Sequence, residues 1–479
     1  MTEPTGSSPP ATDAIVLKFG GTSVADAAAC GRVAHIVRRA QRSARPIVVV
    51  SALSGATDAL FAAAERAARG DPSGAAGSLG PLFERHAVIA RQLATPDAAP
   101  LVLAELDRTR RDLAQLLEAR ARDPGQAAAL EDEIASYGER LSAALLAAVL
   151  AAAGLPARVI DARRCIVTDD RHGRASPLGP ETEHRTRAEL APLIAGDLVP
   201  VLSGYIAATA SGVTTTLGRG GSDYTAALVG AALSVREIQI WTDVSGVLTA
   251  DPRVVHAAHT VPSLSYAEAA ELAYFGAKVL HPKAIQPAMD RAIPVRIANS
   301  RAPDEAGTLV TAQGEVRPGA VKAIAHKTGI TVLQITSTRM LGAYGFLRAL
   351  FEVFDRHRTV VDVVTTSEVS VSLTLEDAGS LAQITAELRA LGEVSVEPRR
   401  AIVCVVGEGL RSTPGIAARV FATLLDINVS LISQGASRVN LTFVVEEARV
   451  GEAVKRLHAA FFERADASAR AGARPAGIA

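Results

Sequence analysis

The residues with the clearest chemical character lie together in the stretch Thr214-Thr215-Thr216-Leu217-Gly218-Arg219-Gly220-Gly221-Ser222-Asp223. A β-branched run, three glycines and then an alanine-rich segment predict a strand, a tight turn and a helix. Glycines let the backbone approach a ligand, and a helix N-terminus favours negative charge. Arg219 can pair with a carboxylate or phosphate, and Asp223 can hold a metal ion or a lysine. The stretch therefore predicts an anion-binding loop. The alternative is an ordinary tight turn in which Ser222 or Asp223 caps the following helix.

Two common nucleotide sites are excluded for this stretch. It lacks the Gly-Lys-Ser/Thr ending of a P-loop and the spacing of the Rossmann fingerprint. A different phosphate-binding fold is needed.

Lysine is rare in this chain, and its few positions are informative. Only six of the fifty basic residues are lysine, and the first three hundred positions contain only Lys18, Lys278 and Lys283. Arginine therefore serves wherever plain charge is enough. A lysine kept against this bias is a candidate for a compact ammonium contact that a planar guanidinium would not reproduce. We assign this role to Lys18 and Lys278 and leave Lys283 open.

Apolar strand patterns alternate with helical patterns through the first three hundred residues. The run 15–19 ends at Gly20-Gly21 before a helical segment, and the run 47–50 leads into the small-residue turn 51–57. Further strands are expected at 158–161, 199–202, 237–240 and 295–297. This alternation predicts a mainly parallel sheet covered on both faces, with ligands at the carboxyl ends of the strands.

A helical subdomain is expected from Ala75 to about Ala153, with breaks at 95–97 and 123–125. Glu139 lies within it, next to a glycine at the head of an apolar run. Taken alone, Glu139 is interpreted as a solvated or first-turn acid.

A polar loop, 241–253, follows the strand expected at 237–240. Its Thr242, Asp243 and Arg253 are candidates for nucleotide contacts, because open α/β sheets place ligands at this end of a strand. Trp241 is interpreted as a packing anchor.

The C-terminal part contains an internal repeat. A shift of 70 positions lays Gly345–Leu375 on Gly415–Val445 without a gap and aligns Phe351 with Phe421. Each copy has the pattern strand, helix, strand, strand, helix, which predicts two ferredoxin-like βαββαβ units. The segment 301–320 is rich in Pro, Gly and polar residues and marks the boundary before them.

The composition excludes several classes of protein. Fifty basic residues balance fifty acidic ones, and aromatic residues make up 4% of the 479 residues, which argues against a nucleic-acid partner. The three cysteines have no metal-type spacing, so we expect neither a disulfide framework nor a zinc site. The longest apolar run, 141–155, is too short to cross a bilayer, and no signal-peptide pattern is present. A cytoplasmic protein without a membrane partner is expected.

These motifs, in this order, resemble the aspartate kinases of the amino-acid kinase family, especially the lysine-sensitive, single-function type. The likeness covers roughly residues 15–464 and rests on Lys-Phe-Gly-Gly-Thr-Ser-Val, Ser-Tyr-Gly-Glu, Gly-Arg-Gly-Gly-Ser-Asp, Trp-Thr-Asp-Val-Ser-Gly-Val, Phe-Gly-Ala-Lys and the paired repeats, which resemble ACT domains. It implies phosphorylation of the side-chain carboxylate of L-aspartate by ATP with Mg²⁺, on a three-layer αβα sandwich followed by two ACT units. Together with the composition of the termini and of 301–320, the expected segments are a disordered leader (1–13), a kinase domain (14–300), a linker (301–320), two ACT units (321–395 and 396–464) and a disordered tail (465–479).

The resemblance also implies a role for each matching residue. Lys18 and Asp223 would be catalytic, with Asp223 orienting Lys18 or the metal. Aspartate would be bound by Ser51, Thr57, Glu139, Arg219 and Ser222, with Glu139 facing the α-ammonium group and Arg219 a carboxylate. The nucleotide would be held by Gly20, Gly21, Thr242, Asp243, Arg253 and Lys278. Leu248 stands where an aromatic residue often lies beside the nucleotide in relatives.

L-Lysine is the expected feedback effector, with threonine as the alternative. The resemblance implies binding by the first repeat, between subunits of a homodimer or dimer of dimers, through Met340, Phe346, Leu347, Asp362, Ser367 and Glu368. The second repeat has Ile432 and Arg438 in place of the two acids. Two other functions stay open: a kinase for another amino acid, and a catalytically silent amino-acid sensor.

Overall fold

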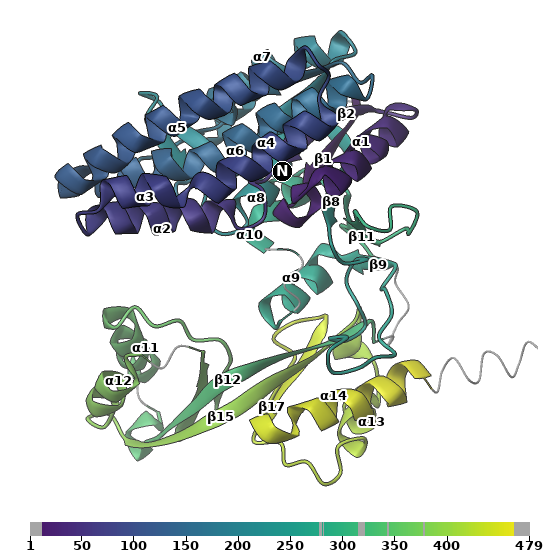
Figure 1. The fold of residues 1–479 in the computed structure, drawn as a ribbon. Helices are drawn as coiled ribbons and strands as arrows, with labels where there is room; N and C mark the ends of the chain where they lie inside the picture. Colours follow the sequence, from purple (N-terminus) through teal and green to yellow (C-terminus); the bar gives the residue numbers. More distant parts are fainter. Residues whose placement is uncertain are drawn as a thin grey trace, which may run out of the picture. The chain divides into compact units, whose positions relative to one another are not determined.

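The computed structural model describes residues 12–276, 280, 282–314, 321–342, 344–376 and 379–463. The chain divides into two compact units, one formed by Met1–Val247 and Val279–Ala312 and the other by Leu248–Lys278 and Gln313–Ala479 (Figure 1). Segment 248–278 therefore groups with the second unit, although the sequence prediction placed it in the kinase domain. The predicted nucleotide contact Lys278 lies outside the described residues, as do nearly all of the predicted leader and the whole predicted tail.

The main sheet of the first unit has the strand order β3-β5-β2-β1-β8-β10-β11. These strands are β1 (Thr12–Phe19), β2 (Arg45–Val50), β3 (Ala157–Ile160), β5 (Val199–Ser203), β8 (Val235–Thr242), β10 (Val295–Asn299) and β11 (Thr308–Thr311). Neighbouring strands from β3 to β10 pair in parallel, and only β11 pairs antiparallel within this order. The mainly parallel sheet predicted from the alternating pattern is confirmed.

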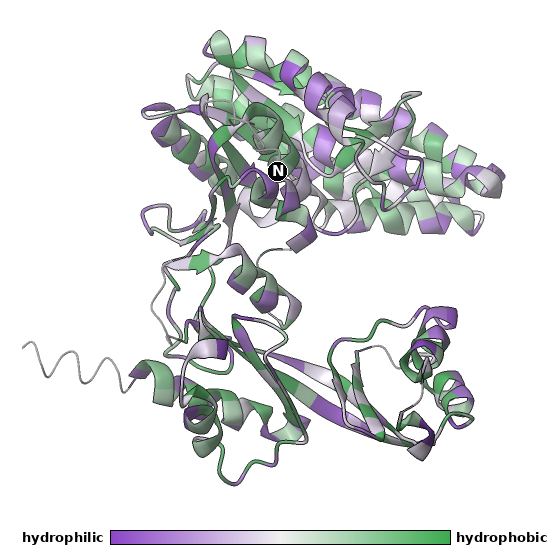
Figure 2. Ribbon diagram, turned by 180° about the vertical axis from the view of Figure 1, so that it is seen from behind, coloured by the Kyte–Doolittle hydropathy of each residue, from purple (hydrophilic) through white to green (hydrophobic). Residues whose placement is uncertain are grey.

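Helices cover both faces of this sheet (Figure 1). On one face, alternate side chains of β1, namely Ile15, Leu17 and Phe19, join a hydrophobic cluster with α1 (Ala27–Gln41) and α6 (Ala127–Ala152). On the other, α8 (Gly221–Leu233) packs on β1, β2 and β8, and α7 (Gly179–Ala195) and α10 (Pro282–Asp290) pack on α8. Figure 2 shows hydrophobic strands between helices of mixed character. The predicted three-layer αβα sandwich is confirmed.

The predicted helical subdomain is present and is broken where the sequence indicates. It comprises α2 (Ala56–Ala68), α3 (Pro72–Ser78), α4 (Gly80–Leu93), α5 (Ala98–Arg122) and α6. The helix Pro124–Ala152 is the one helix of the described chain that is long and apolar enough to cross a membrane, and 78% of its most apolar window is buried inside the fold. Its apolar character is that of a core helix.

A small sheet in the order β4-β6-β7 supports the glycine-rich turn; its strands are β4 (Val167–Thr168), β6 (Ile206–Thr209) and β7 (Thr214–Thr216). Helix α8 begins directly after the turn, as predicted. Its N-cap is Gly220, which has a left-handed backbone with φ of 73°, and no side chain caps it. The alternative that Ser222 or Asp223 caps the helix is therefore wrong, because both lie inside the first turn.

In the second unit, α9 (Tyr266–Tyr274) precedes two repeats that share one sheet in the order β13-β14-β12-β15-β17-β16. The strands are β12 (Ala323–Thr336), β13 (Val364–Thr366), β14 (Ser370–Leu375), β15 (Glu393–Val406), β16 (Leu431–Gln434) and β17 (Asn440–Glu446). The helices are α11 (Phe346–Arg356), α12 (Leu381–Leu388), α13 (Ile416–Ala422) and α14 (Val450–His458). Gly345 and Gly415 are the N-caps of α11 and α13, with φ of 80° and 78°, so the 70-residue repeat is also a structural repeat.

The two repeats share their longest strands. The end of β12, with Leu333 and Ile335, packs in the core of the first repeat, whereas its start, with Ile324, packs in the core of the second. Strand β15 likewise pairs with both ends of β12 and supplies Val403 to the second core. The second repeat thus takes one strand from before the first repeat in the chain, so a cut near residue 395 would pass through β15.

Candidate active site

A cavity of about 390 Å³ opens in the first unit, where β1, β2 and β5 end. It is lined by Lys18, Gly21, Ser51, Ala52, Leu53, Ser54, Gly55, Thr57, Asp58, Glu139, Tyr205, Gly218, Gly220, Gly221, Ser222 and Asp223. Among the residues predicted from sequence, Lys18, Ser51, Thr57, Glu139, Ser222 and Asp223 meet here, and Gly21 joins them. Residues separated by some two hundred positions are gathered because parallel strands end at the same edge of the sheet.

Lys18 and Asp223 form an ion pair across this cavity. Lys18 Nζ lies 2.6 Å from Asp223 Oδ1, and the two side chains are 12% and 14% exposed. The contact is close enough for an ion pair but lacks hydrogen-bond geometry. One of the six lysines therefore stands at the cavity with its charge held in place.

Two helices begin at the cavity without side-chain caps. The N-caps of α2 and α8 are Gly55 and Gly220, whose φ values of 76° and 73° lie in the left-handed region that favours glycine. The first-turn amides of a helix lack intrahelical partners and carry the positive end of the helix dipole. Both helices can therefore bind anionic oxygens at this cavity.

Glu139 is a buried carboxylate in the middle of α6, and the interpretation from local sequence as a solvated or first-turn acid is wrong. The residue is 3% exposed, and its Oε2 has no hydrogen-bond partner among the described residues. Burial raises the pKa of Glu139 to about 8, against a smaller lowering by the Ala52 backbone amide and by Lys18. Such a carboxylate is best stabilised by a cation entering the cavity.

The floor of the cavity permits no side chain at Gly21. A Cβ on Gly21 would lie 2.7 Å from the Ala52 carbonyl oxygen, which is closer than real contacts allow. The Gly21 carbonyl also accepts a hydrogen bond of 3.2 Å from the Ser54 amide. Gly21 therefore lets the loop after β1 lie directly on the loop after β2.

Several predicted contacts do not line this cavity. Arg219 is exposed, although its neighbours Gly218 and Gly220 belong to the lining. Thr242 is the last residue of β8 and Asp243 follows it, and the Gly20 amide donates to the Trp241 carbonyl at 3.1 Å. The roles of these residues stay predictions.

The remaining nucleotide candidate of the 241–253 loop belongs to the second unit. Arg253 is paired there with Asp251, with 2.6 Å between Nη2 and Oδ2, and its side chain is 88% exposed. Trp241 is 3% exposed and stacks on Phe19 with ring centroids 6.2 Å apart, in agreement with a packing anchor.

Tyr205 is a cavity residue that the motifs do not indicate. It follows β5 with a φ of 67°, which is rare for a residue with a side chain, and the pKa of its phenol is raised to about 12 by burial. Its ring packs so closely on Gly221 that a Cβ there would lie 2.6 Å from Tyr205 Cδ2. The sequence could have indicated Tyr205 only by its position after an apolar strand.

The predicted effector residues lie in the first repeat of the second unit. Met340 precedes α11, Phe346 and Leu347 begin it, and Ser367 and Glu368 form the turn between β13 and β14. The two acids differ in burial: Glu368 is exposed, whereas the side chain of Asp362 is 4% exposed. Its Oδ1 accepts a hydrogen bond of 2.5 Å from the Tyr274 hydroxyl and lies 3.7 Å from Lys327 Nζ, whereas its Oδ2 has no partner among the described residues.

Comparison with known proteins places this geometry in a family. The model of the amino acid kinase family matches residues 13–299, and an ACT domain model matches residues 403–461. Lysine-sensitive aspartokinase 3 of Escherichia coli (strain K12) is 39% identical over 460 residues, which cover 94% of this chain and 100% of that protein. Chloroplastic aspartokinase 1 of Arabidopsis thaliana is 38% identical, over 95% of this chain and 81% of its own.

Solved structures of aspartokinases are also similar to this chain. E. coli aspartokinase III in complex with aspartate and ADP (R-state) is similar with a TM-score of 0.79 and 38% identity, over 94% of this chain and 99% of that one. The same enzyme in complex with lysine and aspartate (T-state) gives a TM-score of 0.78, over 94% and 100% of the two chains. The ion pair, the buried glutamate, the uncapped helices and these likenesses agree, and the chain belongs to the aspartokinases of the amino acid kinase family.

Proposed function

We propose that the chain transfers the γ-phosphoryl group of ATP to the side-chain carboxylate of L-aspartate, giving 4-phospho-L-aspartate and ADP. One carboxylate oxygen bonds to the γ-phosphorus while the bond from that phosphorus to the β,γ-bridging oxygen breaks. A carboxylate with a pKa of about 3.9 is already ionised at neutral pH, so no general base is required. The difficulty is to bring two anions together, which calls for positioning and positive charge.

The unpartnered, buried carboxylate oxygen of Glu139 carries this proposal. The α-ammonium group of an amino acid is the cation that such an oxygen needs, and Glu139 faces the cavity that Lys18 also lines. The amides at the N-termini of α2 and α8 bind the carboxylates of aspartate and the phosphate oxygens. Lys18, held by Asp223, neutralises the transferring group. Aspartate bound to the E. coli relative supports this choice of substrate.

We propose that Mg²⁺ enters with ATP. No cluster of three or more His, Cys, Asp or Glu that could hold a metal ion exists among the residues that the structure describes. Mg²⁺ is usually held by substrate phosphates together with one or two carboxylates, and Asp223 is an acid at the cavity that fits this need. When bound, the ion neutralises charge on the phosphates. ADP in the E. coli complex supports ATP as the phosphoryl donor.

The direct test is an ADP-release assay with L-aspartate, with L-glutamate and without an acceptor. Trapping of the acyl phosphate by hydroxylamine identifies the product. Hydroxamate formation with aspartate alone supports the proposal. Turnover with glutamate instead would indicate another amino-acid kinase, and no turnover with either would indicate a sensor.

We also propose feedback inhibition by L-lysine through the first repeat. Asp362 and Glu368 are acids on the segment that follows α11, and the N-cap of α11 is Gly345, so no side chain caps this helix. Lysine carries two ammonium groups and one carboxylate, which match two acids and one helix N-terminus. The second repeat offers Ile432 and Arg438 at the equivalent positions. Lysine in the T-state complex of the E. coli relative supports this effector.

A homodimer formed through the repeats, or a dimer of such dimers, is proposed as the assembly. Large apolar side chains on the first repeat are exposed at Leu341, Tyr344, Leu347, Phe351 and Val364. A second copy of the chain is the partner proposed for them, and light scattering of the purified protein tests its mass. We propose a cytoplasmic location, supported by the free, buried state of all three cysteines, which cell fractionation tests.

A further inference from the structure

The glycine-rich turn at the cavity is tied to α6 by a buried aspartate that has no part in the motifs above. Asp132 is 2% exposed, and both of its oxygens accept hydrogen bonds from two separate segments. From Thr216, at the end of β7, it accepts the hydroxyl at 2.5 Å and the amide at 3.2 Å. From the loop after β4 it contacts His172 Nδ1 at 2.8 Å and accepts the Gly173 amide at 3.0 Å.

The two segments that Asp132 joins run side by side into the turn. The Ala175 amide donates to the Thr216 carbonyl at 2.9 Å, and a Cβ on Gly218 would lie 3.1 Å from the Gly173 carbonyl oxygen. Gly218 is the first residue of the turn that lines the cavity. The backbone of the turn is therefore fixed where it enters the site.

The same contact reaches the cavity by a second route. Leu217, the residue after the Thr216 that Asp132 binds, donates its amide to the Tyr205 carbonyl at 2.9 Å. Tyr205 lines the cavity and packs on Gly221. By holding Thr216, Asp132 thus fixes the backbone that enters the turn and, through Leu217, the backbone of Tyr205 beside it.

Helix α6 connects this contact with substrate binding. Asp132 and Glu139 are seven residues apart, so they lie near the same face of the helix, about 10 Å apart along its axis. Glu139 lines the cavity, and Asp132 holds the turn that forms another side of it. One rigid helix therefore sets the distance between the two parts of the substrate site.

We propose, on the basis of the function proposed above, that Asp132 is a positioning residue for aspartate binding: through Thr216 and Gly173 it fixes the turn Gly218–Gly220 and the start of α8 relative to Glu139. It does not touch the substrate itself. Both oxygens of its carboxylate face N–H or O–H donors. An asparagine would place an NH₂ group against at least one of them.

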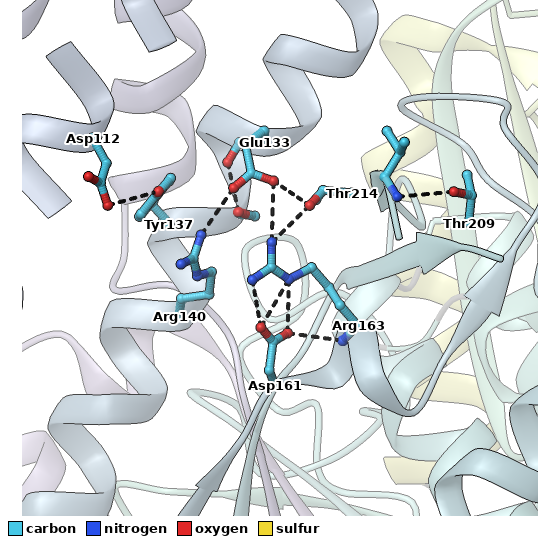
Figure 3. A network of polar contacts seen from close by, with 10 residues as sticks. Asp112, Glu133, Tyr137, Arg140, Asp161, Arg163, Thr209 and Thr214 are labelled. Carbon is cyan, nitrogen blue, oxygen red and sulfur yellow. Dashed lines mark hydrogen bonds and ion pairs between the residues drawn. The ribbon is translucent and has the colours of Figure 1, made fainter. Parts of the chain in front are cut away.

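The neighbouring acid on α6 provides a matched control. Glu133 binds the Thr214 hydroxyl and contacts Arg140 and Arg163 at 3.2 and 3.3 Å, in the network shown in Figure 3. Thr214 and Thr216 lie on the same strand and are 4% and 0% exposed. Thr214 is two residues further from the turn, and its bonds do not reach the cavity lining. Thr216→Val and Thr214→Val remove the same group from the same strand.

The experiment compares KM for aspartate, KM for ATP, kcat and melting temperature in wild type, Asp132→Asn, Thr216→Val and Thr214→Val. We expect KM for aspartate to rise about tenfold in Asp132→Asn and several-fold in Thr216→Val, while KM for ATP stays within about twofold. In Thr214→Val we expect both KM values to stay within about twofold of wild type, with a similar loss of melting temperature to that of Thr216→Val.

Three results would overturn the positioning role: an unchanged KM for aspartate in Thr216→Val, equal changes in the two threonine variants, or parallel changes in both KM values. Thr216→Val decides the question if Asp132→Asn does not fold. Failure of the proposed function is distinguishable, since wild type would then not phosphorylate aspartate at all. A wild type that turns over aspartate, with variants that bind it normally, contradicts the positioning role alone.

Discussion

Lys18 Nζ lies 2.6 Å from Asp223 Oδ1, so the end of β1 is joined to the first turn of α8 by one ion pair. The two residues are 205 positions apart in the chain, and both line the cavity that also contains Glu139. The carboxylate keeps the ammonium group from turning toward solvent, where a long flexible side chain would gain entropy.

We expect Lys18→Arg to lower kcat by about 10²-fold or more, because a planar guanidinium keeps the charge but not the compact geometry beside Asp223. The melting temperature should change little, since the charge and the ion pair remain. Lys283→Arg, which makes the same change at an exposed position of α10, is the control. Near-normal turnover of Lys18→Arg would remove Lys18 from its catalytic role.

Glu139→Gln should raise KM for aspartate and leave KM for ATP nearly unchanged, because it removes the charge that faces the α-ammonium group. In wild type, ligand-free Glu139 has a pKa of about 8, so binding an ammonium group near neutral pH releases a proton. KM for aspartate should therefore fall as the pH rises from 6 to about 8, and this dependence should be absent from the variant. A rise in KM for ATP instead would show that Glu139 lies at the nucleotide.

The same pKa predicts how stability changes with pH. The pKa of Glu139 is raised in the folded chain from 4.5 to about 8, so between these values the folded state holds a proton that the unfolded state has released. The free energy of unfolding therefore falls as the pH rises through this range, by at most a few kcal/mol from this group. Glu139→Gln removes the dependence. Its melting temperature relative to ligand-free wild type should rise from pH 5 to pH 9, and a constant difference would show that Glu139 titrates normally.

Local sequence predicted the fold well because its signals are local. The run 15–19, the turn 51–57 and the helix breaks at 95–97 and 123–125 depend on periodicity and on Gly and Pro, and the structure reproduces them. The 70-residue repeat is confirmed by the paired glycine N-caps of α11 and α13. The sharing of β12 and β15 by both repeats could not be predicted, because strand pairing between distant segments leaves no local pattern.

The site shows the same limit. The scarcity of lysine indicated Lys18, and the position of Asp223 just after the glycine-rich turn indicated Asp223. The burial of Glu139 could not be read from its neighbours, since it depends on how α6 packs on the Ala52 loop, where a Cβ on Gly138 would lie 2.9 Å from the Ala52 Cβ. Asp132 was missed for the same reason: its donors come from Thr216 and Gly173, which the fold alone brings together.

Glu368→Ala should abolish inhibition by L-lysine and leave turnover without lysine unchanged, because the exposed Glu368 in the turn between β13 and β14 would face an ammonium group of the effector. Arg438→Ala, at the equivalent position of the second repeat, should keep lysine inhibition. Lysine and threonine are titrated separately in the ADP-release assay. A wild type that is indifferent to lysine but inhibited by threonine would show that threonine, and not lysine, is the effector.

Gly21→Ala should abolish most activity, because the new Cβ would lie 2.7 Å from the Ala52 carbonyl oxygen and would push the loop after β1 away from the loop after β2. Both loops line the cavity, so the groups that bind aspartate and those that bind the phosphate oxygens would be displaced relative to each other. Gly31→Ala is the matched control: this glycine lies inside α1 with nothing within 4 Å of a new Cβ. Replacing a glycine inside a helix by alanine stabilises by about 0.5–1 kcal/mol, so Gly31→Ala should keep full turnover and raise the melting temperature. Steady-state kinetics and thermal unfolding of the two variants decide the matter, and an active Gly21→Ala would show that the two loops do not need their close contact.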